Sequence, residues 1–143
     1  MAIDFSPASG RALEAARALA RRTGAALTIA HVRPTSDMRA AIEEDRGDLL
    51  KPGSGSLSRR LGEHYARRLA EWVRPQPGEE PRLLRGAPDV ALAREARRGY
   101  DLIILGNHGV GPVPLPLMGS TVERVLARST VPVLVVPFSR TAR

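Results

Sequence analysis

The chain has 143 residues, of which 43% are hydrophobic, so we expect one compact domain over residues 1–143. It contains no cysteine, which excludes disulfide bonds, thiolate metal sites and cysteine nucleophiles. No stretch approaches the roughly 20 apolar residues of a membrane span, and the sequence does not begin with a basic and apolar leader. We therefore expect a soluble, cytoplasmic protein without a membrane partner.

The formal net charge of +7 raises the question of an anionic partner such as nucleic acid. Lys51 is the only lysine, and the arginines are scattered in pairs over several predicted helices rather than gathered on one. Aromatic residues make up only 3% of the chain, too few for a platform that stacks single-stranded bases. We interpret most arginines as solvated helix faces, so nucleic acid is not the expected partner.

The first part of the sequence predicts a strand, a helix and a second strand. Residues 2–4 are expected to end a buried strand, and Ser6 with Pro7 supplies an N-cap and a first helical residue. The helix is expected to stop near Gly24, and residues 26–32 form a β-rich apolar run. Two strands joined by a helix are nearly always parallel, which favours an α/β fold.

The middle of the sequence contains one segment without a defined element. Residues 35–56 carry mixed charge and end in a glycine- and serine-rich stretch, so we expect a variable loop or short helix and assign no function there. A long helix is predicted from Leu57 to Pro75, with an apolar stripe that includes Trp72 as a core residue. A short third strand follows at residues 81–85.

The last part of the sequence repeats the alternation. A helix is predicted over residues 89–98, a buried strand over 102–105, a helix over 120–128 and a final strand over 131–136. A loop rich in glycine and proline spans residues 106–119. Five strands thus alternate with four helices, as in an α/β protein with a parallel sheet.

The glycine-rich loop is the strongest functional signal, because open parallel sheets bind ligands beyond the carboxyl ends of their strands. Gly106 and Gly109 can bring backbone N–H groups close to an anion, and Gly119 opens a helix that begins with the hydroxyls of Ser120 and Thr121. Alternatively, the glycines are only turn residues and Ser120 is only an N-cap. Taken one at a time, each residue fits that alternative better.

Two familiar phosphate motifs are missing. The sequence has no G-x-x-x-x-G-K-[ST] segment, and its Gly106-x-x-Gly109-x-Gly111 reverses the spacing of the dinucleotide fingerprint. A P-loop NTPase and a dinucleotide-dependent dehydrogenase are therefore not expected.

The spacing G-x2-G-x9-G-[ST] at Gly106, Gly109, Gly119 and Ser120 resembles the nucleotide-binding signature of the universal stress protein family. Other segments resemble the family's first strand and turn, second strand end, third turn, fourth strand and closing strand: residues 2–7, 31–32, 86–88, 101–109 and 131–137. The resemblance covers nearly the whole chain except residues 35–56.

The resemblance implies the fold and the ligand of the family's ATP-binding subgroup. The fold is a three-layer, Rossmann-like open sheet of five parallel strands with helices on both faces, as in the adenine nucleotide alpha hydrolase-like proteins. The implied ligand is ATP, with ADP or AMP as alternatives and Mg²⁺ possible with ATP. The implied partner is a second copy of the chain, bound through antiparallel pairing of the last strands between Val131 and Val136.

The resemblance also assigns site residues. Asp4 and the backbone of Val32 would face the ribose and adenine, with Ala2 and Leu105 nearby. The residues that would hold the phosphates are Gly106, His108, Gly109, Gly119, Ser120 and Thr121. For His108, a phosphate donor and a turn residue are both open, whereas His31 and His64 are expected to be packing and surface residues.

Two departures from the family pattern bear on the site. The chain begins three residues before Asp4, so we expect a shortened first strand, from a late start site or a truncated sequence. Residues 110–118 are apolar and carry three prolines, which lack N–H donors. This loop leaves open a triphosphate, AMP or ADP as ligand, or a stiff apolar docking surface.

The leading functional hypothesis is an ATP-binding stress or signalling module whose nucleotide alters its conformation and partner choice. A slow ATPase or autophosphorylating protein is the enzyme alternative, and a protein-docking module without nucleotide is another. Asp89 and Asp101 lie in a turn and at a strand start, so we find no acidic pair for metal-bridged phosphates and assign no catalytic or metal-ligating residue.

Overall fold

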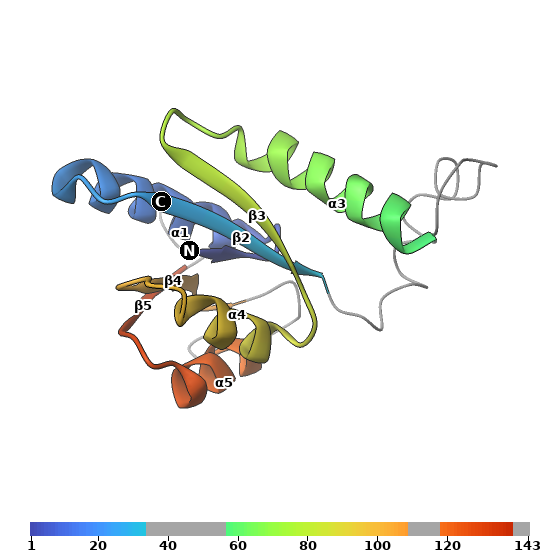
Figure 1. Cartoon of the computed structure of the whole chain (residues 1–143). Coiled ribbons are helices and arrows are strands. Elements are labelled where there is room, and N and C mark those ends of the chain that lie inside the picture. Colours follow the sequence, from blue (N-terminus) through green and yellow to red (C-terminus); the bar gives the residue numbers. More distant parts are fainter. Residues whose placement is uncertain (34–56, 109–117, 139–143) are drawn as a thin grey trace.

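The computed structural model describes residues 1–33, 57–108 and 118–138, with strands and helices alternating along most of the chain (Figure 1). In chain order the elements are β1 (Ala2–Ile3), α1 (Pro7–Thr23), β2 (Leu27–Arg33), α3 (Leu57–Val73), β3 (Glu79–Arg85), α4 (Pro88–Ala96), β4 (Ile103–Gly106), α5 (Ser120–Arg128) and β5 (Val133–Val136). The expectations for residues 35–56 and 110–117 lie outside the described residues. None of the described helices is long and apolar enough to cross a membrane.

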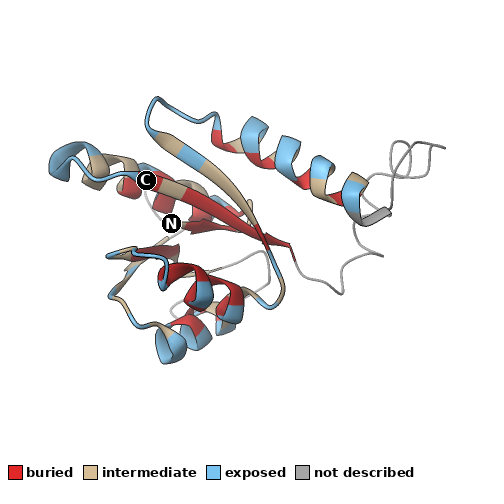
Figure 2. Cartoon of the chain, viewed as in Figure 1, coloured by how far each residue is buried: buried red, intermediate tan, exposed pale blue. Residues whose placement is uncertain are grey.

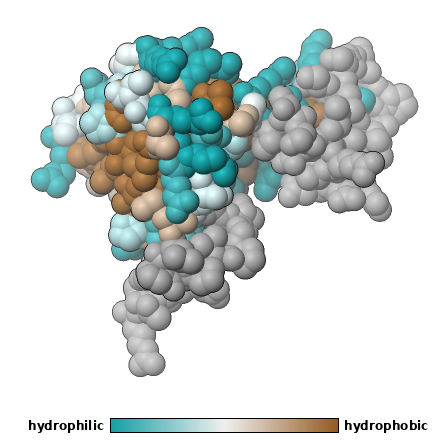
Figure 3. All heavy atoms as spheres, turned by 90° about the horizontal axis from the view of Figure 1, so that it is seen from below, coloured by the Kyte–Doolittle hydropathy of each residue, from teal (hydrophilic) through white to brown (hydrophobic). Residues whose placement is uncertain are grey.

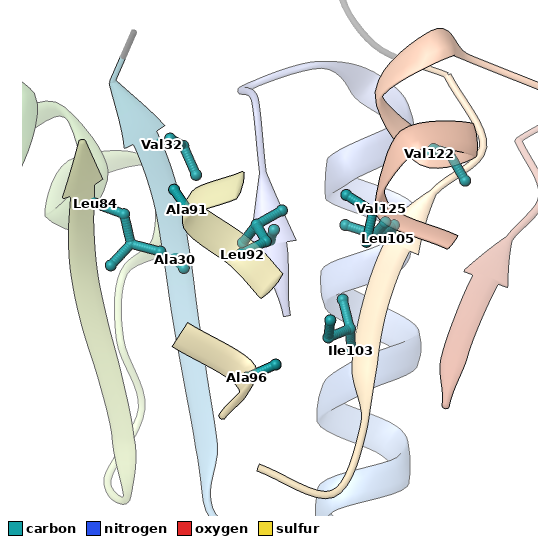
Figure 4. Packing of buried hydrophobic residues seen from close by; sticks show 11 residues of the cluster. Ala30, Val32, Leu84, Ala91, Leu92, Ala96, Ile103, Leu105, Val122 and Val125 are labelled. Carbon is teal, nitrogen blue, oxygen red and sulfur yellow. The ribbon is translucent and has the colours of Figure 1, made fainter. Parts of the chain in front are cut away.

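The five strands are parallel and follow the order β3, β2, β1, β4, β5 (Figure 4). Ladder hydrogen bonds join β1, β2 and β3 into one group and β4 and β5 into another. β1 lies in contact with β4, but within the described residues no ladder joins the two, since β1 has only two residues. The predicted five-stranded sheet is therefore present as five strands in two hydrogen-bonded groups.

Helices cover both faces of the sheet, which confirms the predicted three-layer α/β architecture (Figure 1). On one face, Leu92 of α4 and Val125 of α5 pack in one cluster with Leu105 of β4 (Figure 4). On the other face, Leu13 of α1 and Leu69 of α3 share a cluster with apolar residues of β1, β2 and β4. Buried residues lie on the sheet side of the helices and exposed residues on the outer side (Figure 2), as expected for amphipathic helices.

The ends of α1 follow the predicted local signals. The Ser6 hydroxyl accepts a hydrogen bond from the Ser9 backbone N–H at 3.1 Å, and Pro7 is the first helical residue. Gly24 ends the helix in the left-handed conformation at φ 70°. Both boundaries are confirmed because the residues that fix them lie within four positions of the helix end.

Several other boundaries differ from the prediction by one or two residues, and those of β2, β4 and α4 are examples. β2 continues to Arg33, one residue further than predicted, because Arg33 pairs with Arg85 in the parallel ladder. β4 includes Gly106, which was assigned to the loop, because Gly106 pairs with Val136. α4 ends at Ala96, two residues early. The first two differences arise from pairing across strands, which a local pattern does not report.

Candidate functional site

A pocket of about 410 Å³ lies at the carboxyl ends of the strands, next to the starts of α1, α4 and α5. Of the ten residues predicted to contact a nucleotide, the pocket is lined by nine: Ala2, Asp4, Val32, Leu105, Gly106, His108, Gly119, Ser120 and Thr121. The tenth, Gly109, lies outside the described residues. Separate stretches of sequence thus meet at one edge of the sheet, although their contact with a nucleotide stays a prediction.

Asp4 is held in place by the first turn of α1. Its Oδ1 accepts hydrogen bonds from the Ser9 hydroxyl at 2.5 Å and from the Ser6 backbone N–H at 3.1 Å. The chain turns directly after it at Phe5, whose φ of 64° lies in the left-handed region. Both bonds use Oδ1, so Oδ2 is the carboxylate oxygen that can accept from a ligand hydroxyl.

The wall beneath the pocket is apolar and includes a neutral histidine. Ala2, Val32 and Leu105 are buried, and His31 lies among the lining residues. The His31 Nδ1 lies 3.0 Å from the Ile3 carbonyl oxygen, which can only accept, so Nδ1 carries the hydrogen. Burial lowers the pKa of His31, which keeps the ring uncharged at neutral pH. This wall suits a flat, uncharged ring.

The predicted packing role of His31 agrees with its contacts. The Phe5 ring centroid lies 4.4 Å from that of His31, and Tyr65 of α3 stacks on it at 5.6 Å. His31 therefore joins the floor of the pocket to α3, on the far side of the sheet.

Gly106 has a steric role that the sequence did not reveal. A Cβ atom at this position would lie 2.8 Å from the backbone carbon and oxygen of Ala8, in the first turn of α1. The glycine is thus required for β4 and α1 to approach each other. Gly106 was predicted to contact an anion, but its close approach to Ala8 explains the glycine without a ligand.

Asn107 connects the ends of β4 and β5 to the start of α5. Its backbone N–H donates to the Val136 carbonyl at 3.1 Å, and its carbonyl accepts from the Gly119 N–H at 2.9 Å. Its side-chain Oδ1 accepts from the Phe138 N–H at 2.8 Å. These three bonds fix where α5 begins relative to the sheet.

The orientation of Asn107 determines the tautomer of His108. Because the Phe138 N–H can only donate, the amide oxygen must face it, and the amide nitrogen must face His108 Nε2 at 3.0 Å. Nε2 therefore accepts, and the neutral ring carries its hydrogen on Nδ1. The Nδ1 atom is buried and has no hydrogen-bond partner among the described residues. His108 thus lines the pocket as a neutral ring, and its Nδ1–H donates to no described residue.

The start of α5 differs in one detail from the predicted phosphate cradle. Gly119 is the N-cap, with an extended backbone at φ −68° and ψ 142°, and no side chain caps the helix. The Gly119 N–H already donates to Asn107, so it is not free for a phosphate. The N–H groups of Ser120, Thr121 and Val122 form the first turn and have no carbonyl four residues earlier within the helix.

Several residues in and around the pocket were not predicted from the sequence. Ser9 and Asn107 position Asp4 and His108, and Pro88 and Leu92 of α4 form a further wall. The Ser6-x-x-Ser9 spacing was visible as a cap signal, but nothing local connects Ser9 to Asp4. Among the described residues, no group of three histidine, aspartate or glutamate side chains could hold a metal ion.

Comparison with known proteins identifies relatives of this chain. The profile of the universal stress protein family matches residues 1–137. The relative described as "Universal stress protein in QAH/OAS sulfhydrylase 3'region", from Thermus aquaticus, is 32% identical over 147 residues, which cover 95% of this chain and 95% of that relative.

Solved structures share the fold. The hypothetical protein MJ0577 superposes with a TM-score of 0.74 at 23% identity, over 98% of this chain and 94% of that chain. A universal stress protein in complex with cAMP superposes with a TM-score of 0.57 at 26% identity, over 95% of this chain and 92% of that one. The family profile, the curated relative and the shared fold lead to one conclusion: the chain belongs to the universal stress protein family.

Proposed function

We propose that this chain is an ATP-binding universal stress protein of the cytoplasm, a single domain over residues 1–143. Its bound nucleotide would set its conformation and its choice of partner in a stress response or signalling pathway. The observation that carries the proposal is the gathering of nine predicted nucleotide contacts around one pocket of about 410 Å³. That volume lies within the roughly 300–1,000 Å³ of small-molecule sites.

The two ends of the pocket suit the two ends of an adenine nucleotide. At one end, the apolar wall with Val32 would take the adenine, and Oδ2 of Asp4 would accept from a ribose hydroxyl. At the other end, the first turn of α5 and the Nδ1–H of His108 offer donors to phosphate oxygens. No described metal-ligand group lies there, so any Mg²⁺ would be bound through the triphosphate.

Comparison supports the adenine part of this proposal. One relative of similar fold was solved in complex with cAMP, which shares the adenosine portion and a phosphate with ATP. We place ATP first and ADP, AMP and cAMP as competing ligands of the same pocket.

The first experiment identifies what the purified protein carries. The protein is prepared without added nucleotide and denatured, and released small molecules are identified by chromatography and mass spectrometry. Stoichiometric adenine nucleotide is the expected result, and its phosphate number would also distinguish ATP from ADP and AMP. An empty protein that shows no binding to ATP, ADP, AMP or cAMP would overturn the proposal.

A variant localises the site. Asp4→Asn keeps an oxygen for Ser9 but removes the charge, so we expect adenosine nucleotides to bind about tenfold more weakly. Asp101→Asn, an exposed residue outside the pocket, is the matched control and should bind as the parent does. Slow hydrolysis or phosphate transfer to the protein would appear as ADP or labelled protein in the same samples, and its loss in Ser120→Ala would favour the enzyme alternative.

We also propose that two copies associate through β5. The strand ends the described sheet on the side away from β1, and its Leu134 is 41% exposed. The face that carries α4 and α5 shows an apolar area (Figure 3), and an unpaired apolar edge strand otherwise invites aggregation. Sedimentation should give a dimer for the parent and a monomer for Leu134→Lys. A monomeric parent at micromolar concentration would contradict this part of the proposal.

A further inference from the structure

Arg33 is a buried cation that has no counter-charge among the described residues. It is the last residue of β2 and only 8% exposed. Its Nε is buried without a hydrogen-bond partner, and within residues 1–33, 57–108 and 118–138 no carboxylate forms an ion pair with it. A buried charge is costly unless it is paired, so this guanidinium indicates an anion that the described chain does not supply.

Other partly buried arginines show what a satisfied arginine looks like in this fold. Arg17 donates to both carboxylate oxygens of Glu79, and Arg82 bonds to Glu80 and Glu95. Their side chains are 17% and 29% exposed. Arg33, which has no ion-pair partner among the described residues, is therefore more buried than Arg17 and Arg82. Solvation alone would favour the opposite, with the unpaired arginine exposed to water.

A second arginine lies beside the first. Arg33 pairs with Arg85 of β3 in the parallel ladder, so both side chains project from the same face of the sheet. Arg85 is exposed, and its Nη2 lies 3.5 Å from where a Cβ would stand on Gly62 of α3. Arg85 also forms no ion pair with the described residues. Two like charges side by side are unfavourable unless an anion lies between or above them.

This pair lies at the ligand-binding edge but on the opposite face from Val32. Val32 belongs to the cluster under α4 and α5, and side chains alternate along a strand, so Arg33 faces the layer of α1 and α3. α3 begins at the end of the molecule where β2 ends (Figure 1), and its first turn carries no acidic residue.

We propose that Arg33 and Arg85 bind a phosphoryl group on the α3 face of the sheet edge. Each guanidinium presents paired N–H donors that match phosphate oxygens. A phosphoryl dianion balances two arginines, whereas one carboxylate balances one. Neither Arg33 nor Arg85 lines the pocket that holds Asp4, and this proposal does not assume that a nucleotide binds in that pocket. Its ligand is a free phosphate compound or the phosphate tail of a nucleotide.

The test uses inorganic pyrophosphate as the probe and thermal unfolding of the full chain as the readout. Pyrophosphate should raise the unfolding midpoint of the parent, and Arg33→Met should abolish that rise by weakening pyrophosphate binding about tenfold or more. Without anion, Arg33→Met should unfold at a higher temperature than the parent, because it removes an unpaired buried charge. Arg85→Gln, on the surface, should lose the pyrophosphate response while folding normally.

Two controls frame the result. Arg67→Met, which removes an exposed charge from α3, should keep the full pyrophosphate response. Arg82→Met should lower the midpoint instead, because the buried Glu95 loses its closest cation and, among the described residues, keeps only the longer contacts with Arg98 and the Tyr100 hydroxyl. The proposal is overturned if pyrophosphate does not stabilise the parent, if Arg33→Met responds as the parent does, or if Arg33→Met without anion is less stable than the parent.

Adenosine, which lacks phosphate, distinguishes the source of the phosphoryl group. Stabilisation by adenosine should be unchanged in Arg33→Met, since adenosine would occupy only the pocket. If pyrophosphate stabilises the adenosine-saturated parent further, the phosphoryl ligand is an independent compound. If adenosine and pyrophosphate exclude each other, and ATP raises the unfolding midpoint more than AMP only in the parent, the phosphoryl group is the phosphate tail of a nucleotide. If pyrophosphate stabilises the parent but adenosine does not, the result counts against the nucleotide proposal and supports the Arg33–Arg85 site.

Discussion

The amino and carboxyl ends of the sheet differ in whether their buried polar side chains have hydrogen-bond partners among the described residues. At the amino end, Arg17 donates to both oxygens of Glu79 at 2.7 and 2.8 Å and to the Val73 carbonyl at 2.9 Å. At the carboxyl end, Arg33 Nε and His108 Nδ1 are buried and have no partner among the described residues. Within the described residues, polar groups at the amino end are therefore paired with each other, whereas the carboxyl end has buried donors without a partner.

Removing the Arg17–Glu79 pair at the amino end should have the largest effect on the free energy of unfolding. Arg17→Met removes both bonds to Glu79 and those to the last carbonyls of the α3 end, and leaves Glu79 unpaired. We expect a loss of about 3 kcal/mol in the free energy of unfolding, measured by urea denaturation. Arg59→Met is the matched control, because the Arg59–Glu63 pair is exposed and should contribute less than about 0.5 kcal/mol. Equal losses in both variants would contradict the comparison.

The next effect concerns the close approach at the carboxyl end. In Gly106→Ala the new methyl group would meet the Ala8 backbone at 2.8 Å, so β4 and α1 must separate. We expect a loss of about 2 kcal/mol in the free energy of unfolding. Gly10→Ala in the same helix meets only Trp72 at 3.9 Å and should be neutral or stabilising by up to about 1 kcal/mol. A neutral Gly106→Ala would show that the glycine is not needed for packing.

The two ends should also lose stability at different pH values. Burial lowers the pKa of His31 from 6.5, so its contribution is present above pH 6.5 and lost as the pH falls through the folded pKa. The Arg17 hydrogen bond lowers the pKa of Glu79 from 4.5, so its contribution is lost only below pH 4.5. Urea midpoints should therefore fall in two stages on acidification.

Variants assign the two stages. His31→Gln should remove the upper stage and Glu79→Gln the lower one. Difference profiles against the parent separate both from the Met1 amine, whose pKa burial lowers to about 6. An upper stage that persists in His31→Gln would contradict the assignment of that stage to the carboxyl end.

The smallest expected effect is a change of tautomer, in which the ring hydrogen of His108 moves from Nδ1 to Nε2. In the parent, ¹⁵N spectra should show His108 protonated on Nδ1, because Nε2 accepts from the Asn107 amide. Asn107→Asp keeps an acceptor for the Phe138 N–H and turns an oxygen towards Nε2, so the hydrogen should appear on Nε2. His64 serves as an internal reference whose spectrum should not change. A parent protonated on Nε2 would contradict the proposed orientation of the amide.

The sequence predicted those features whose causes lie close together along the chain. The Ser6 cap and the Gly24 stop were found because each acts within one helical turn. The family resemblance assigned the site residues, and the rule that parallel strands end at one edge explains why Asp4, Val32 and Gly106 line the same pocket.

The features that the sequence did not predict depend on distant partners. Asn107 bonds to Phe138, 31 residues away, and Gly106 is needed because of Ala8 on another element. Arg33 is buried at the end of β2, and neither the hydrophobic pattern nor the charge count reports it. Even the predicted sheet divides into two hydrogen-bonded groups of strands, because the two described residues of β1 pair with β2 alone.

That division makes the contact between β1 and β4 a seam held by side chains. Amide hydrogens at the seam should exchange with solvent sooner than those in the β2–β3 ladder, since no ladder bond protects them. The pocket lies across this seam, with Val32 on one side and Ser120 on the other. A molecule bound there would contact both groups of strands and hold them together. Amide hydrogens along the seam should then exchange more slowly when the pocket is occupied.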